Sequence, residues 1–237
     1  MNARFVTDAG LAVAPVTTEQ MRELDRTAID GPGPTLQQMM ENAGRTMAEL
    51  TRRSLQAGQV LVLAGPGGNG GGGLCAARHL ANGGAKVTVV LTTDRPGPSA
   101  MQQLELFRET GGAVMEGGEL DGLEPEVVID AMIGYGLDGP PRGAANRSIR
   151  WANAQDAMVI ALDLPSGLDA TTGSAAGAVI RATKTLTLAM PKTGLSAAEV
   201  GDLWLADLGI PEGVYRSAGI DTAGVFETSH LVHLSTR

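Results

Sequence analysis

The sequence predicts a doubly wound α/β protein with a mainly parallel sheet, on which two N-terminal helices pack. Short, continuous apolar runs such as residues 60–64 are typical of strands that are buried on both faces. Segments with helical spacing alternate with these runs, which indicates βαβ units. The 237 residues contain no fixed-period repeat, linker or low-complexity stretch, so we expect one domain over residues 1–237.

Two helices are expected before the first strand, after an irregular lead-in over residues 1–16. Thr17 and Gln20 have the spacing of a capping box, and so do Thr35 and Gln38. Apolar residues recur at helical intervals after each threonine. The Gly-Pro-Gly-Pro run at residues 31–34 then separates the two helices.

The remaining elements alternate between strands and helices. We expect strands at residues 60–64, 86–91, 127–132, 158–164, 184–190 and 203–208, and helices at about 74–84, 99–110 and 143–155. In an open α/β sheet, ligands bind outside the carboxyl ends of the strands. The functional residues are therefore expected directly after the apolar runs.

Charge and cysteine content limit the partners and the compartment. The formal net charge of −8 argues against nucleic acid and anionic membranes, because both select for basic surfaces. No apolar run reaches transmembrane length, and the N-terminus has no secretory pattern. Cys75 is the single cysteine, so no intramolecular disulfide can form. We expect a protein of the reducing cytoplasm that binds a small molecule.

The first candidate site is the glycine-rich segment 65–73, which we expect to form a loop between a strand and a helix. Free backbone N–H groups and the positive end of a helix dipole bind phosphate groups at such places. The segment satisfies the G-x-G-x-x-G pattern, but it lacks the Lys-Ser/Thr pair of a nucleoside triphosphate loop. The alternative is a merely flexible connection.

Two carboxylates end the next strands. Asp130 precedes a second glycine-rich segment, where it can bind a cation or ribose hydroxyls, or simply cap the loop. Asp163 precedes a tight turn that presents Ser166, and we expect Asp163 to act as a general acid or base. Its alternative role is an Asx turn. We expect Cys75 to be a small core residue rather than a nucleophile.

Several ordered motifs resemble the YjeF N-terminal domain family, whose characterised members are NAD(P)HX epimerases. The resemblance covers about residues 17–211. Its motifs are MMENAG at 39–44, GPGGNGGGG at 65–73 followed by AARHL, DAMIGYGLDGP at 130–140, DLPSGLD at 163–169 and PKTGL at 191–195. It implies a Rossmann-like three-layer α/β/α sandwich, a homodimer, and interconversion of the R and S epimers of hydrated NADH or NADPH. A separate dehydratase would then restore the cofactor.

The resemblance also implies roles for individual residues. Asp163 would be catalytic. Potassium ligands would be Asn69, Asp130 and Ser166. Substrate contacts would come from Gly68, Asn69, Gly70, Gly71, Gly72, Gly134, Tyr135, Gly136, Leu137, Asp138, Gly139, Pro140 and Asp163.

The chain departs from the family's usual GPGNNGGDG loop at Gly68 and Gly72. We expect an Asp at position 72 to order the loop and bond a ribose hydroxyl. Two other functions are weighed against the epimerase. One is a nucleotide-sensing or scaffolding module that binds without turnover. The other is an NAD-dependent oxidoreductase, for which Asp94 stands where a ribose-binding acid belongs.

Overall fold

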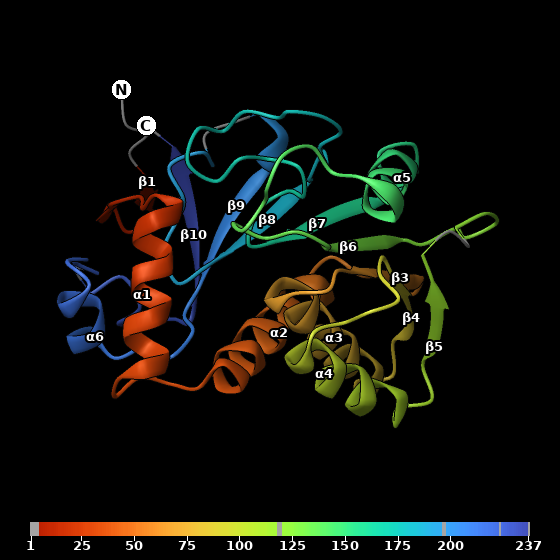
Figure 1. Ribbon diagram of the computed structural model, residues 1–237, viewed down its shortest axis with the longest axis horizontal. Helices are drawn as coiled ribbons and strands as arrows, with labels where there is room; N and C mark the ends of the chain where they lie inside the picture. The colour runs from red at the N-terminus through yellow and green to blue at the C-terminus, as the bar shows by residue number, and fades with distance from the viewer. Residues whose placement is uncertain (1–4, 118–119, 196–197, 223, 237) are drawn as a thin grey trace.

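A computed structural model describes residues 5–117, 120–195, 198–222 and 224–236 of the chain. The strands are β1 (Phe5–Thr7), β2 (Ala12–Val13), β3 (Gln59–Ala64), β4 (Lys86–Leu91), β5 (Ala113–Glu116), β6 (Val127–Ala131), β7 (Met158–Leu162), β8 (Lys184–Leu188), β9 (Asp202–Ala206) and β10 (Leu231–Thr236). They join one sheet in the order β2-β1-β10-β9-β8-β7-β6-β3-β4-β5 (Figure 1). The run from β9 to β5 is parallel, and β10, β1 and β2 extend it antiparallel.

The helices are α1 (Thr18–Asp30), α2 (Leu36–Arg52), α3 (Gly68–Asn82), α4 (Pro98–Arg108), α5 (Gly143–Ala152) and α6 (Glu212–Ser217), with a 3₁₀ turn at Ala198–Val200. Both capping boxes are confirmed. Thr17 Oγ1 accepts a hydrogen bond from Gln20 N at 3.2 Å, and Thr17 N donates to Gln20 Oε1 at 2.9 Å. Thr35 and Gln38 repeat this pair at the start of α2. The two predicted N-terminal helices therefore begin where their caps indicate.

The sheet is covered on both faces, which confirms the three-layer α/β/α prediction. Along β3, Val60 and Val62 pack in one core cluster with residues of α2, α3 and α4. Leu61 and Leu63 point the other way and pack with Ile149 of α5. Figure 1 shows α2, α3 and α4 together on one side of the sheet and α5 on the other. A third cluster joins α1 and α6 to the end of the sheet that carries β9, β10 and β1.

Several elements were not anticipated. The lead-in over residues 1–16 was expected to be irregular, and this was wrong for β1 and β2, which form an antiparallel pair. Strand β1 also pairs with β10, with Phe5 opposite Thr236, so its structure depends on residues at the far end of the chain. Strands β5 and β10 and helix α6 were likewise missed. Among the described residues, no helix is long and apolar enough to span a bilayer.

Candidate active site

A pocket of about 610 Å³ opens at the carboxyl ends of β3, β6 and β7. Its volume is in the range of small-molecule sites. Side chains of α1 and α2, including Met21, Met39 and Met40, form an apolar wall. Polar groups enter from the segments that follow the strands, as expected for an open α/β sheet.

The sites expected from the sequence meet at this pocket, although their residues contribute unequally. Gly68, Asn69, Gly72, Gly134, Tyr135, Gly136 and Asp163 line the wall. Gly70 and Gly71 are buried inside α3, and Leu137, Asp138, Gly139 and Pro140 lie beyond the wall that the described residues form. Asp130 and Ser166 are fully buried next to the lining segment that begins at Met132.

The glycine-rich segment is a helix for most of its length, so the expectation of a loop over residues 65–73 was wrong. Helix α3 begins at Gly68, and Gly71 N donates to Gly67 O at 3.0 Å. A Cβ atom at Gly70 would lie 1.9 Å from Gly65 O, and one at Gly73 would lie 2.3 Å from Ala131 Cβ. The glycines thus let the helix approach the strand ends closely. No side chain caps Gly67, which leaves the exposed start of α3 suited to an anion.

Asp163 is held in an uncommon backbone conformation at the pocket. Its φ angle of 70° lies in the left-handed region, which for residues other than glycine is sparsely populated and clusters at functional sites. Its Oδ1 forms an ion pair with Lys192 Nζ and accepts a bond from Leu188 N at 3.4 Å. Its Oδ2 accepts a bond from Tyr135 N at 3.3 Å. The carboxylate is therefore fixed in orientation at the pocket wall.

Lys192 is a further site residue, for which the sequence predicted no role. Its side chain is buried, lines the pocket and donates to Leu188 O at 2.8 Å as well as to Asp163. The available signal was a lysine inside the PKTGL motif, directly after an apolar strand. Because a buried ammonium needs a partner, that lysine pointed to a carboxylate nearby.

A second contact joins α1 to the pocket. Tyr135 Oη donates a hydrogen bond to Asp25 Oδ2, and both residues line the wall. Burial raises the pKa of Asp25 above its usual value. Asp25 was also missed as a site residue, because on a helix its spacing resembles that of any solvent-facing carboxylate.

The residues Asp130, Ser166 and Asn69 suit a hard cation. Ser166 Oγ donates to Asp130 Oδ1 at 2.6 Å, and Ser166 N donates to Asp130 Oδ2 at 2.7 Å. Burial raises the pKa of Asp130 to about 6. The amide oxygen and nitrogen of Asn69 are buried and have no partner among the described residues. A buried unpaired amide calls for an ion or water, and these oxygen donors are of the kind that hard cations bind.

Two other residues weighed from the sequence lie outside this pocket. Asp94 is exposed, with 83% of its side chain accessible, so it is not placed to bind a ribose there. Cys75 is buried in α3, as expected for a small core residue. Burial raises the pKa of its thiol to about 12, which keeps it from acting as a nucleophile.

This chain is similar to known proteins in both sequence and fold. The family model of the YjeF-related protein N-terminus matches residues 36–194. An NAD(P)H-hydrate epimerase of Dehalogenimonas lykanthroporepellens is 48% identical over 99% of this chain and 98% of its own length. A bifunctional NAD(P)H-hydrate repair enzyme of Salinibacter ruber is 36% identical, and the match covers 94% of this chain but 46% of that enzyme. The crystal structure of yeast ynu0, YNL200c, superposes with a TM-score of 0.80 at 24% identity, covering 93% of this chain and 100% of that one. The chain therefore belongs to the YjeF N-terminal family.

Proposed function

We propose that this protein is an NAD(P)H-hydrate epimerase, which interconverts the R and S forms of hydrated NADH and NADPH. The observation that carries the proposal is the Asp163–Lys192 ion pair at the wall of the strand-end pocket, in which Asp163 has a left-handed backbone conformation. Two relatives that match 99% and 87% of this chain are named NAD(P)H-hydrate epimerases.

The reaction requires a proton transfer at one oxygen. The hydrated carbon C6 carries a hydroxyl group and the ring nitrogen, so it resembles a hemiaminal. It inverts either by opening of the ring or by loss and return of the hydroxyl. In the ring-opening route, Asp163 accepts the hydroxyl proton as the C6–O bond becomes a carbonyl, and the C6–N1 bond breaks with its electron pair moving to nitrogen, which takes up that proton from Asp163. On closure, N1 returns the proton to Asp163 and attacks the other face of the carbonyl, and the carbonyl oxygen takes the proton back. In the second route, the protonated form of Asp163 gives its proton to the hydroxyl, and the C6–O bond breaks to release water and leave an iminium ion across C6 and N1. Water then adds to the other face of C6 and returns a proton to Asp163.

The remaining pocket residues bind and orient the substrate. The N–H groups at Gly67 and Gly68 lie at the exposed start of α3, where they can bind the pyrophosphate. The methionine wall of α1 and α2 offers an apolar surface to the rings. Lys192 keeps the carboxylate of Asp163 in position for the C6 hydroxyl.

The same site is proposed to hold potassium through Asn69, Asp130 and Ser166. When bound, the ion supplies positive charge that offsets the substrate phosphates and fixes the segments after β6 and β7. We expect the rate of epimer exchange to fall when potassium is replaced by tetramethylammonium at equal ionic strength. The Asn69→Ala variant is expected to lose that difference, and an unchanged dependence in this variant would remove Asn69 from the ion site.

The central experiment follows R/S exchange by chromatography with purified protein. We expect Asp163→Asn to lower the rate by about 10²–10⁴-fold. Asp94→Asn is the matched control, because it makes the same chemical change at an exposed site. Tight NADP⁺ binding without exchange would favour a sensing or scaffolding module. Hydride transfer at the nicotinamide absorbance, lost in Asp94→Asn, would favour an oxidoreductase.

We also propose that this protein is a cytoplasmic homodimer and that it supplies a separate dehydratase with the epimer that the dehydratase consumes. In a coupled assay, dehydratase alone is expected to consume one epimer quickly and the other slowly. Adding this protein should bring both to the fast rate. Light scattering after size-exclusion chromatography tests the dimer, and a monomeric mass at micromolar concentration would refute it.

A further inference from the structure

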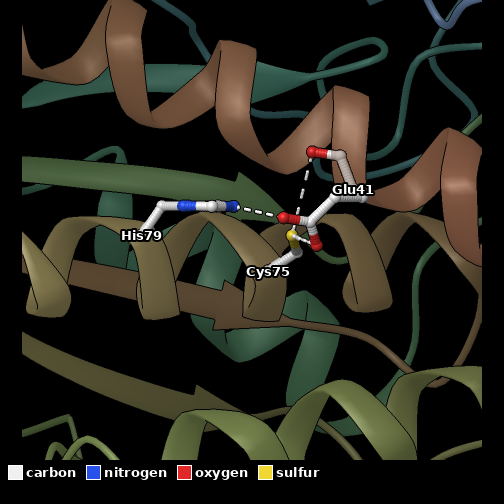
Figure 2. A group of neighbouring side chains, drawn as sticks. All are labelled: Glu41, Cys75 and His79. Carbon is white, nitrogen blue, oxygen red and sulfur yellow. Dashed lines mark hydrogen bonds and ion pairs between the residues drawn. The ribbon is translucent and has the colours of Figure 1, made fainter.

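A second group of reactive side chains lies between α2 and α3, outside the pocket lining. Glu41 extends from α2 toward Cys75 and His79, which are one helical turn apart on α3 (Figure 2). His79 Nε2 lies 2.7 Å from Glu41 Oε1, and Cys75 Sγ lies 3.3 Å from Glu41 Oε2. One ligand atom from each residue can be chosen so that all three lie within 4.8 Å of one another.

The close approach of the two helices brings these groups together. A Cβ atom at Gly44 would lie 2.5 Å from both Cys75 Cβ and Cys75 Sγ. Only glycine at position 44 lets the backbone of α2 approach Cys75 so closely. Glu41, one turn earlier on α2, then reaches the thiol and the imidazole together.

We propose that Glu41, Cys75 and His79 bind a divalent transition-metal ion of the zinc class. Thiolate, imidazole and carboxylate are the ligands of protein zinc sites, with metal–ligand distances of about 2.0–2.3 Å. Ligand atoms around one such ion are roughly 3–4 Å apart, so the cluster needs only small side-chain shifts. Glu41 is 38% exposed, which leaves a fourth position for water.

Binding must also accommodate Arg78. Its guanidinium donates to Glu41 Oε2 and lies 3.3 Å from Cys75 Sγ. It can remain on Oε2 as an outer partner while Oε1 binds the ion, an arrangement that orients metal-ligating carboxylates in proteins. Burial raises the pKa of the Cys75 thiol to about 12 in the metal-free protein, but a coordinated thiol loses its proton because the charge of the metal ion replaces it. The proton passes to solvent as sulfur donates an electron pair to the metal. No electron transfer is involved.

The metal site has a structural consequence for the pocket. Met40 on α2 and Asn69 on α3 both line the pocket, and Met40 is the neighbour of Glu41 in the chain. An ion that joins α2 to α3 would hold these two walls together. It would also raise the melting temperature, because it binds only the folded protein.

Cobalt(II) added to metal-free protein tests the proposal directly. Cys75 is the only cysteine, so a sulfur-to-cobalt charge-transfer band in the near ultraviolet can arise only at this site. We expect such a band, its loss on adding zinc, and a higher melting temperature with zinc. Absence of the band in folded wild-type protein would overturn the proposal.

Matched variants separate this site from the other histidines. Cys75→Ala, Glu41→Gln and His79→Gln are each expected to weaken zinc binding by about 100-fold or more, since even outer-shell changes cost about 10–100-fold. His230→Gln is the control, because His230 pairs with Glu49 elsewhere. Zinc affinity unchanged in Cys75→Ala, or lost in His230→Gln, would place the metal elsewhere. Circular dichroism verifies the fold of each variant, and Cys75→Ser replaces Cys75→Ala if the alanine variant does not fold.

Discussion

Asp163 and Lys192 form a buried ion pair at the wall of the pocket. Their side chains are 5% and 1% exposed, lower than those of any other ion pair among the described residues. A pair this deeply buried contributes little net stability, because desolvation of both charges opposes their attraction. Removing one partner is costly, however, because it leaves the other charge buried and unpaired.

This asymmetry predicts the outcome of a double-mutant cycle. Asp163→Asn and Lys192→Met are each expected to lower the free energy of unfolding by about 3–5 kcal/mol. Asn tolerates the left-handed conformation at position 163, so the backbone can persist. The double variant should lose much less stability than the sum of the two single variants, yet all three should exchange the epimers at least about 100-fold more slowly than wild type. Urea unfolding and chromatography measure the two effects, and additive losses of stability would show that the pair is not coupled.

Gly72 supplies a second prediction for a single residue. The sequence suggested that an Asp here would order a loop and tighten ligand binding, but Gly72 lies inside α3. A Cβ atom at this position would meet Leu162 Cδ2 at 2.9 Å and Ala43 Cβ at 3.9 Å. Leu162 must therefore shift for any side chain at position 72, and a carboxylate there would lie next to the pocket that Gly72 lines.

Comparing Gly72→Asp with Gly72→Ala isolates the effect of the carboxylate on binding, because both variants place the same Cβ atom against Leu162. We expect the Asp variant to bind NADP⁺ about 10–100-fold more tightly than the Ala variant. A hydrogen bond from a ribose hydroxyl to a charged group contributes about 1.5–3 kcal/mol. Titration calorimetry measures both affinities. Equal or weaker binding by the Asp variant would show that no ribose hydroxyl reaches position 72.

Among the secondary structure elements, those fixed by local signals were predictable and those fixed by distant partners were not. Helices α1 and α2 follow from their threonine caps, and β3 follows from its apolar run. Strand β1 has three residues and exists because β10 and β2 pair with it. The prediction of a loop at the start of α3 was wrong. Glycine usually indicates a loop, whereas here it permits close packing of the helix on the strand ends.

A histidine links neighbouring strands at the antiparallel end of the sheet. His233 of β10 lies between Asp8, which follows β1, and Asp202 of β9, at 2.7 Å and 2.8 Å. Hydrogen bonds to these carboxylates raise the pKa of His233 above its usual value, with Asp8 contributing most. The charged imidazole therefore stabilises the folded protein below the unfolded-state pKa of about 6.5, and this contribution is lost as pH rises through the folded-state value.

We predict that His233→Gln lowers the free energy of unfolding more at pH 5.5 than at pH 8.5. Exposed pairs of this kind contribute about 0.2–1 kcal/mol each, so the difference should be of that order. Urea unfolding of both proteins at both pH values measures it. His230→Gln provides a comparison, because His230 is also near a carboxylate but joins no strands of this edge. A larger loss at pH 8.5 would contradict the assignment.

At the scale of the whole molecule, the pocket lies where two separate hydrophobic core clusters meet. Met21 and Met39 belong to the core cluster around α1 and α6, whereas Met132 belongs to the cluster around α5. The sequence predicted which strand ends would converge, because parallel strands place their carboxyl ends at one edge. It could not predict that α1 would form a wall, since that depends on how Asp25 meets Tyr135 across the fold.

This arrangement predicts how a ligand changes the dynamics of the protein. NADP⁺ in the pocket would contact α1, the start of α3 and the segment after β6 at once, and so join the clusters that surround them. We expect amide hydrogen exchange to slow in all three regions when NADP⁺ is added, and to stay unchanged in β5 and β10, which do not line the pocket. A ligand that binds only the closed form would suppress local opening of α1 by mass action. Tyr135→Phe removes the bond to Asp25, so exchange in α1 should be faster than in wild type before ligand is added. Mass spectrometry of peptides from each region measures these rates, and protection confined to the start of α3 would show that α1 takes no part in binding.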